Sequence, residues 1–529
     1  MIRMLTRRLA VPLALAVAFA LPARSEPAPK TTLRIVLIND LASLDPVQST
    51  AAFVRNHGFL VYDQLFALDS HGVAQPQMVG AYEVSPDAMS YRFTLRDGLV
   101  FHDGQPVRAV DAVASIRRWS QRDIVGKALA SATAALEVVD EKTFTLRLSR
   151  PFALVTEALA RATASALFVM PERIASTPAN TAITDATGSG PFIFQPDQWR
   201  AGERAVYTRN AAYVPRTEPA DGLAGGKQPL LERIEWLSLP DPATAAAALQ
   251  QGEIDLIEQP SPDLIPVLER ARDVRTMALN PVGFMIWLRI NQTQPPFNRP
   301  EARQALLHLI NQQDVLNAVG VRPSEQVPYC PAYFFCGTPL ESAAGAVGLR
   351  APDVARARAL LQEAGYNGEK IVFMDAADSP INHAATQTMA AAFRTAGLNV
   401  DTPSMDWATI TQRRHRREPV DQGGWNFFVT VANVLDGQNP LTNLYLASPC
   451  EGGLTGWPCD QPLEDLRRSW WEENDPAKRM EILQHIQARA FVALPYINAG
   501  QFRTLAAYRA NVVGLRPTIV PVFWGVSKQ

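Results

Sequence analysis

The sequence predicts an α/β protein with at least two lobes, from its length and from the alternation of its elements. At 529 residues the chain is too long for one hydrophobic core, because single cores stop growing near roughly 250 to 300 residues. Strand patterns alternate with helix patterns, as in a strand over 33–38, a strand over 91–95 and a helix over 110–119. A hydrophobic fraction of 47% and a charged fraction of 19% are typical of a globular protein.

Capping residues mark several predicted helices. An aspartate can cap the first turn of a helix, proline fits the first helical position and glycine suits the end. Three helices are predicted in this way, opening at Asp241, Asp353 and Asp475 and closing at Gly252, Gly365 and near Leu494. The last carries a stripe that we interpret as facing a lobe core: Met480, Leu483, Ile486, Ala490 and Phe491. Segments 215–229 and 337–352 are predicted surface excursions.

The N-terminus predicts a cleavable secretory signal peptide over 1–25. Basic residues Arg3, Arg7 and Arg8 precede an apolar run over 9–21, and small residues Ala23 and Ser25 precede the mature chain. The run has 13 residues, whereas a membrane span needs about 20. We expect cleavage near Ser25 and a periplasmic protein without a lipid anchor, because no cysteine lies near the cut. An uncleaved anchor and the twin-arginine export route are the alternatives.

Charge and cysteine content agree with export. The formal net charge of −2 becomes −6 without the first 25 residues, which hold four arginines and no acid; this argues against nucleic acid or an anionic membrane as a partner. Two local disulfides are the simplest interpretation of the four cysteines, although three pairings are possible. A zinc site would need closer cysteine spacing. The cysteines are Cys330, Cys336, Cys450 and Cys459.

The sequence lacks the short motifs of common enzymes. Its seven histidines include no pair at helical i,i+4 spacing, so a metallohydrolase site lacks its ligands. The nucleophile elbow G-x-S-x-G and the phosphate-binding glycine loops are also absent. We therefore expect neither an enzyme nor a cofactor. An exported hydrolase with dispersed catalytic residues and a non-transporting ligand sensor remain the alternative functions.

A family resemblance covers nearly all of the chain after residue 25. The stretch GAYEVSPDAMSYRFTLR over 80–96, followed by DGLVFHDG over 97–104, resembles the signature of the extracellular solute-binding protein family 5. That family contains dipeptide-, oligopeptide- and nickel-binding receptors of ABC importers. Further landmarks occur in the family's order: SLDP over 43–46, GSGPF over 188–192, RNAAY over 209–213, the segment 234–258 with DPATAAAALQQGEIDL, and the segment 288–319.

The resemblance implies a two-lobed fold of the type II periplasmic-binding-protein kind, cluster C. Two α/β lobes would be joined by two crossing strands, with ligand enclosed between them. Mapped onto this chain, lobe one covers 26–275 plus 495–529, with an extra subdomain over 70–185, and lobe two covers 276–494. The implied function is a monomeric periplasmic receptor that captures a small solute and delivers it to an ABC permease and ATPase complex. Lobe closure would be driven by the difference in ligand affinity between the open and closed states.

The segment WNFFVTVANVLDGQNPLTN over 425–443 is the richest region for ligand contacts. Peptide-binding relatives carry there a tryptophan, then an aspartate that pairs with the peptide amino terminus, then a proline. Aligned on Pro440, the aspartate corresponds to Asp436 and the tryptophan to Asn433. A desolvated carboxylate orients an ammonium group strongly, but Asp436-Gly437 is equally a turn signal. Because the tryptophan is missing, the peptide assignment is weakened. A short peptide stays the leading candidate for the ligand, and an opine, sugar, modified amino acid or metal chelate are the alternatives.

Several other residues are candidates for the cleft. Tryptophans and tyrosines supply flat apolar walls, although core packing is the common alternative, and residues that end a strand of an open α/β sheet often contact ligand. The basic run over 413–417 could attract an anion but is typical of a solvated helix face. The aromatic candidates are Trp407, Trp425, Trp457 and Tyr333, and those that follow the first strand are Asn39 and Asp40.

Overall fold

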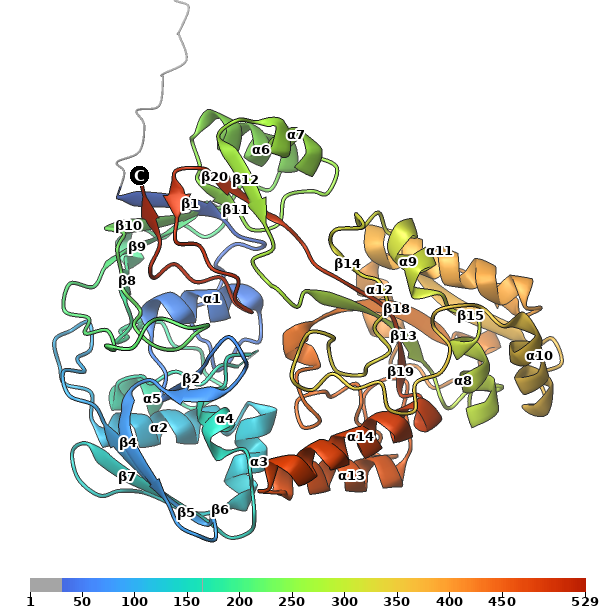
Figure 1. The fold of residues 1–529 in the computed structure, drawn as a ribbon, viewed down its shortest axis with the longest axis horizontal. Helices are drawn as coiled ribbons and strands as arrows, with labels where there is room; N and C mark the ends of the chain where they lie inside the picture. Colours follow the sequence, from blue (N-terminus) through green and yellow to red (C-terminus); the bar gives the residue numbers. More distant parts are fainter. Residues whose placement is uncertain (1–30, 164) are drawn as a thin grey trace, which may run out of the picture.

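The computed structural model describes residues 31–529 apart from residue 164, so the predicted signal peptide lies outside the described residues. The chain forms two lobes that lie side by side and are joined by two crossing segments (Figure 1). Among the described residues, no helix has the length and apolarity that a bilayer crossing requires.

Lobe one is built on a seven-stranded mixed sheet in the order β12-β20-β11-β1-β10-β9-β8. The central strand β1 runs parallel to β10 and β11, while the remaining pairs are antiparallel. The strands are β1 (Thr32–Val36), β8 (Phe192–Phe194), β9 (Arg204–Arg209), β10 (Arg233–Leu237), β11 (Leu256–Ile257), β12 (Val274–Met277) and β20 (Ala506–Arg509), with helices α1 (Ala52–Val61), α6 (Pro242–Gln251) and α7 (Ile265–Arg270) and the 3-10 turn η1 (Pro196–Gln198). A short pair near the C-terminus joins β21 (Val512–Val513) to β22 (Ser527–Lys528).

A four-stranded antiparallel sheet, β4-β5-β7-β6, forms the lower part of lobe one (Figure 1). In β5 the side chains of Tyr91, Phe93 and Leu95 are buried and alternate with more exposed ones, which confirms the predicted half-buried strand. The elements are β2 (Phe66–Leu68), β3 (Ala74–Pro76), β4 (Val79–Val84), β5 (Ser90–Leu95), β6 (Thr133–Val138), β7 (Thr143–Leu148), α2 (Ala109–Trp119), α3 (Ile124–Ala132), α4 (Val155–Leu159) and α5 (Glu172–Ala175).

Lobe two holds the second seven-stranded sheet, in the order β14-β19-β13-β18-β15-β16 with β17 also beside β15. Its strands are β13 (Phe284–Ile290), β14 (Gln326–Val327), β15 (Lys370–Ala376), β16 (Asn399–Asp401), β17 (Ser404–Met405), β18 (Phe427–Asn433) and β19 (Tyr496–Phe502). Its helices are α8 (Pro300–Leu307), α9 (Gln312–Ala318), α10 (Val354–Glu363), α11 (Pro380–Thr395), α12 (Trp407–Arg413), α13 (Gln461–Glu472) and α14 (Pro476–Ala493), with 3-10 turns η2 (Val420–Gln422) and η3 (Val434–Asp436).

The chain crosses between the two sheets twice. The first crossing lies between β12 and β13, over 278–283, and the second between β19 and β20, over 503–505. Because β19 pairs with β13 along most of its length, residues 496–502 belong to the sheet of lobe two. The return to lobe one therefore lies after residue 502 and not at the sequence-based boundary of 495.

The helix boundaries marked by aspartate and glycine are confirmed. The Asp241 side chain accepts the N–H of Thr244 at 2.7 Å, and Gly252 ends the same helix in the left-handed region with φ 79°. Asp353 and Asp475 cap α10 and α14 in the same way. The predicted core stripe on α14 needs one correction, since Met480 is 37% exposed and lies in the wall of the cavity described below.

Three of the sequence landmarks meet in lobe one and have a structural role. The backbone passes so close at Gly188 that a Cβ there would lie 2.0 Å from the carbonyl oxygen of Val61. The Gly190 carbonyl accepts a bond from the Asn210 side chain at 2.9 Å and lies 3.1 Å from His102 Nε2. The glycines are therefore required by close backbone approach, and this landmark cluster connects the signature segment to the main sheet.

Candidate functional site

A cavity of about 630 Å³ lies between the two lobes. Both lobes and the first crossing segment contribute to its wall, which is the arrangement expected of a site that closes around a ligand. Lobe one contributes the β2–β3 turn, α4 and the segments near 222 and 518, and lobe two contributes the segments near 338 and 438 and the start of α14. Its lining includes Asp69, Ser70, His71, Glu157, Arg161, Leu223, Pro281, Val282, Thr338, Leu340, Val434, Gln438, Asn439, Trp470, Arg479, Met480 and Ile519.

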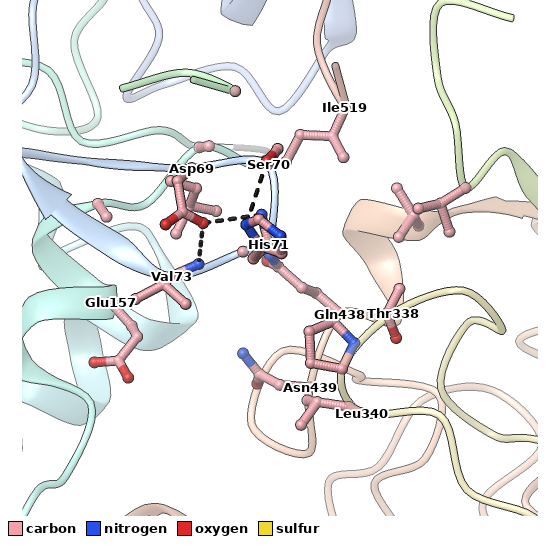
Figure 2. A pocket seen from close by; sticks show the side chains of 18 of the residues that line it. Asp69, Ser70, His71, Val73, Glu157, Thr338, Leu340, Gln438, Asn439 and Ile519 are labelled. Atoms are coloured by element: carbon pink, nitrogen blue, oxygen red, sulfur yellow. Dashed lines mark hydrogen bonds between the residues drawn. The ribbon is translucent and has the colours of Figure 1, made fainter. Parts of the chain in front are cut away.

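The β2–β3 turn carries polar side chains into this cavity. The Asp69 carboxylate accepts the backbone N–H groups of His71 and Val73, both at 2.9 Å, and Gly72 adopts φ 78°. These bonds fix a tight turn whose tip is Ser70 and His71. Figure 2 shows this turn beside the cavity, with residues of lobe two on the opposite wall.

The lobe-one wall carries acidic groups that would favour a cationic ligand group. Asp69 and Glu157 line the cavity, and Asp221 accepts the N–H of Ser70 at 3.2 Å. The positive charge of Arg161 is balanced, because its Nε lies 3.3 Å from the carboxylate of buried Asp123. Side-chain atoms of Asp69, His71 and Asp221 lie close together. The Asp69 carboxylate is at the same time engaged in the hydrogen bonds that form the turn.

On the lobe-two side, the loop that follows the first disulfide forms part of the wall. Cys330 and Cys336 are bonded, as are Cys450 and Cys459, so the predicted pairing is confirmed. Buried Gln501 donates to the carbonyls of Val282 and Cys336 at 3.0 and 2.9 Å and accepts the Cys336 N–H at 2.9 Å. The strand that leads back to lobe one thus holds the disulfide loop against the first crossing segment.

Removal of the Cys330–Cys336 bond by serine at both positions is expected to lower the unfolding free energy by about 2 kcal/mol. This is the chain-entropy value for a closed loop of this size, set by the sequence separation of 6. Urea unfolding of the double variant and of the oxidised wild type would measure the difference. In the double variant, dithiothreitol can reduce only the second disulfide, so any further loss of stability on its addition belongs to that bond. A double variant as stable as the oxidised wild type would contradict the expectation.

Asn433 and Asp436 are brought together by a 3-10 turn. The Asp436 carboxylate accepts the backbone N–H of Asn433 at 2.9 Å, and the Asn433 side chain accepts the N–H of Leu435 at 3.1 Å. The two side chains form a reciprocal capping box for η3. Asp436 therefore does stabilise a turn, as its sequence context allows. Its side chain is nevertheless exposed, and in the chain it stands between Val434 and Gln438, which line the cavity.

The surroundings of Asp436 come from both lobes. Although the carboxylate keeps contact with solvent, burial between the lobes raises its pKa above the ordinary value, while the Asn433 N–H and the charges of Arg55 and Arg161 act in the opposite direction. Arg55 and Arg161 belong to lobe one. The charges of two lobe-one arginines therefore act on the ionisation of this lobe-two carboxylate.

Comparison with known proteins gives the family. Residues 73–452 match the sequence profile described as "Bacterial extracellular solute-binding proteins, family 5 Middle". This chain belongs to that family. It is 38% identical to the probable peptide ABC transporter periplasmic-binding protein y4tO of Sinorhizobium fredii, across 98% of both chains. It is 25% identical to the glutathione-binding protein GsiB of Escherichia coli K12, across 95% of this chain and 94% of the relative.

Solved structures of solute-binding proteins share the fold. The substrate-binding protein CtaP of Listeria monocytogenes superposes with a TM-score of 0.79 at 19% identity, covering 94% of this chain and 99% of that one. DppA of Helicobacter pylori, in complex with the peptide STSA, gives a TM-score of 0.72 at 20% identity, covering 94% and 98%. The expected two-lobed α/β architecture of the family is confirmed.

Two aromatic residues that the sequence proposed for the cleft of this solute-binding protein lie in the core of lobe two. Trp425 is fully buried in a small core with Phe428, and its indole N–H donates to the carbonyl of Arg414 at 3.1 Å. Tyr333 is 3% exposed and its hydroxyl donates to the carbonyl of Ala490 at 2.9 Å. The proposed ligand contacts of both are corrected, because their surfaces are already occupied by protein.

The remaining candidates lie outside the cavity wall. Trp407 and Trp457 pack partly buried against the small core around Trp425. Asn39 is exposed after β1, and the Asp40 carboxylate accepts the N–H of Gly202 at 2.5 Å within lobe one. In the basic run 413–417, Arg413 donates to the carbonyls of Gly423 and Gly424, and Arg417 lies over the Trp457 ring.

The two lobes also touch at the rim that lies away from the crossing segments. Arg150 of lobe one bonds Glu472 of lobe two at 3.0 Å, and the Ala153 N–H donates to the carbonyl of Trp471 at 2.8 Å. Arg479 donates to the Ala153 carbonyl at 3.4 Å. Any separation of the two lobes at this rim would break these contacts.

The cavity wall contains residues that the sequence did not single out. Ser70 and His71 sit on an ordinary hairpin turn, and Gln438 and Asn439 sit beside Asp436 in the segment already favoured. The sequence pattern of the loop 337–340 indicates only a surface excursion. Its position directly after Cys336 was the available signal, since a disulfide holds a loop in a fixed place.

Proposed function

We propose that this protein is a periplasmic receptor that binds a short peptide or peptide-like solute between its lobes and delivers it to an ABC importer. The main support is a cavity of about 630 Å³ that is lined by both lobes. The chain that forms it is similar, over 98% of its length, to a probable peptide ABC transporter periplasmic-binding protein. Closure of the lobes around a solute would create the surface that a permease recognises.

Asp436 is proposed to contact a cationic group of the solute, such as the amino terminus of a peptide. Two features support this role: the side chain is exposed beside the cavity-lining residues Val434 and Gln438, and the Asn433 N–H holds the carboxylate in place. Closure of the lobes on a solute would remove water from the carboxylate, and a desolvated carboxylate forms a stronger and more directional bond to an ammonium group than a solvated one.

Asp436→Asn is expected to weaken binding of the best-bound short peptide by about ten- to a hundredfold, the usual worth of a hydrogen bond to a charged group. Native mass spectrometry of the purified protein would identify retained solute, a thermal-shift screen of dipeptides and tripeptides would find ligands, and calorimetry would give the affinities. Exposed Asp421, also in lobe two, supplies the control variant Asp421→Asn, which should bind like the wild type. Equal affinity of the Asp436→Asn protein would contradict the role.

The pH dependence of binding gives a second measurement. Only the ionised carboxylate attracts an ammonium group, and burial raises the pKa of Asp436. Peptide affinity should therefore fall as pH decreases toward and through that raised pKa, and this fall should be absent from the Asp436→Asn protein.

The transport role is tested separately. Deletion of the gene should abolish uptake of the identified solute, and normal uptake in the deletion strain would contradict the transport role.

A further inference from the structure

The cavity between the lobes exposes large apolar side chains on both of its walls. Val73 of the β2–β3 turn is 53% exposed and Met480, near the start of α14, is 37% exposed, and both line the cavity. Leu340 and Ile519 line it as well and are partly buried. Figure 2 shows Val73 and Ile519 on the side of lobe one and Leu340 on the side of lobe two. Apolar surface from two lobes therefore faces one shared space.

On lobe two, polar side chains of the wall are bonded to protein. The Thr338 hydroxyl donates to the carbonyl of Phe335 at 2.7 Å. The side-chain oxygen of Asn439 accepts the N–H groups of Leu441 and Thr442, both at 3.0 Å. These bonds hold each wall segment in place, and the groups that make them are already used when a solute arrives.

On lobe one, polar side chains of the wall are engaged in the same way. The Thr518 hydroxyl donates to the carbonyl of Val520 at 2.5 Å, and its backbone N–H donates to the carbonyl of Leu279 at 2.7 Å. The second carboxylate oxygen of Asp69 accepts the side-chain amide of Gln75 at 2.9 Å, in addition to the turn bonds described above. These polar groups stabilise the wall itself, and the apolar side chains beside them are held in place.

This distribution of polar and apolar groups favours an apolar partner in the cavity. An apolar side chain of a solute would cover exposed apolar surface of both walls at once. That contact would exist only when the lobes are closed, which is the condition for a solute to drive closure. Because the walls are already held in place, binding adds little cost of ordering them. A polar side chain of equal size would lose hydrogen bonds to water and find few replacements.

We propose that the cavity takes a large apolar side chain of the solute, between Val73 and Ile519 of lobe one and Leu340 and Met480 of lobe two. The class of solute is then a short peptide that carries a bulky aliphatic or aromatic residue. This inference rests on the proposed function, whereas it does not depend on the ammonium role of Asp436. It adds to that function a selection among peptides by the character of a side chain.

Two pairs of dipeptides test the preference: leucyl-alanine with asparaginyl-alanine, and alanyl-leucine with alanyl-asparagine. Leucine and asparagine have side chains of the same branched shape, so each pair compares apolar with polar character at nearly constant size. In titration calorimetry at neutral pH, the leucine peptide of at least one pair should bind at least about tenfold more tightly than its asparagine partner, because its apolar surface leaves water on binding.

A double variant tests the assignment of this preference to the two walls. Val73→Ser with Met480→Ser removes one exposed apolar side chain from each lobe and should weaken binding of the leucine peptide by about tenfold, while the asparagine peptide changes little. The matched control is Val84→Ser with Val492→Ser, which removes apolar side chains that are 43% and 42% exposed on β4 and α14, outside the cavity wall. It should bind both peptides like the wild type. All four positions are exposed, so both proteins should fold.

The outcomes separate this inference from the function on which it rests. Equal affinities of the wild type within both pairs, or tighter binding of the asparagine peptides, would overturn the inference without any variant having to fold. Full retention of the preference in the folded double variant would overturn it as well. If other short peptides of the screen bind while neither leucine peptide does, the inference fails and the proposed function stands. If no peptide of the screen binds, both fail.

Discussion

Lys227→Met is expected to lower the unfolding free energy of lobe one by about 3 to 5 kcal/mol, the usual cost of breaking a buried ion pair from one side. Lys227 Nζ lies 2.7 Å from the Asp63 carboxylate, and the two side chains are 1% and 0% exposed. The Tyr213 hydroxyl donates to the other Asp63 oxygen at 2.8 Å, and Lys227 also lies over the Trp524 ring at 4.9 Å. Loss of the lysine would leave the Asp63 carboxylate buried with only neutral partners, the Tyr213 hydroxyl and the Gln64 N–H.

Denaturant unfolding followed by intrinsic fluorescence would measure this loss. The control is Lys142→Met, which removes a lysine of the exposed pair with Asp97 and should leave the unfolding midpoint unchanged, since such pairs contribute little. Adding Asp63→Leu to Lys227→Met should recover part of the stability, because no uncompensated charge then remains. A Lys227→Met protein as stable as the Lys142→Met control would show that the ion pair is not required for folding.

The α/β class and several helix ends were predictable from local patterns, whereas the two-lobed architecture with its crossing strands is implied by the resemblance. The caps of α6, α10 and α14 were identified from single aspartates and glycines, since these residues act on their own turn of helix. The boundary at 495 is implied by the resemblance alone. The local pattern could not refine it, because an all-buried strand such as β19 has no alternation that assigns it to one sheet or the other.

The site was predictable only in part. Asp436 and the segment around it were found through the resemblance, whereas Trp425 was misplaced because a tryptophan fits a core as well as a cleft. His71 was missed because its turn resembles any hairpin turn, and only the three-dimensional position of the β2–β3 hairpin brings it to the cavity.

The landmark aspartate of SLDP gives the second large expected effect. Arg118 donates to both oxygens of Asp45 at 3.1 and 2.7 Å, and the side chains are 1% and 0% exposed. Burial by itself would raise the pKa of Asp45, but the hydrogen bonds and charge of Arg118, together with the N–H groups of Val47 and Ile183, outweigh it and lower the pKa. At neutral pH, Arg118→Met should therefore cost about 3 to 5 kcal/mol of unfolding free energy.

The sign of the pH dependence identifies the cause of that loss. In the wild type the folded pKa of Asp45 lies below its unfolded value of 3.8, so the contribution is present above about pH 4 and is lost as pH falls through the folded pKa. Without Arg118, only backbone N–H groups such as those of Val47 and Ile183 oppose the effect of burial on Asp45. The charged carboxylate is then penalised at neutral pH but not once it is protonated. The stability gap between wild type and Arg118→Met should thus be widest near pH 7 and narrow steadily toward pH 3 in thermal unfolding. Arg117→Met, at an exposed position of the same helix, is the matched control, and a gap that stays constant with pH would assign the loss to packing instead of charge.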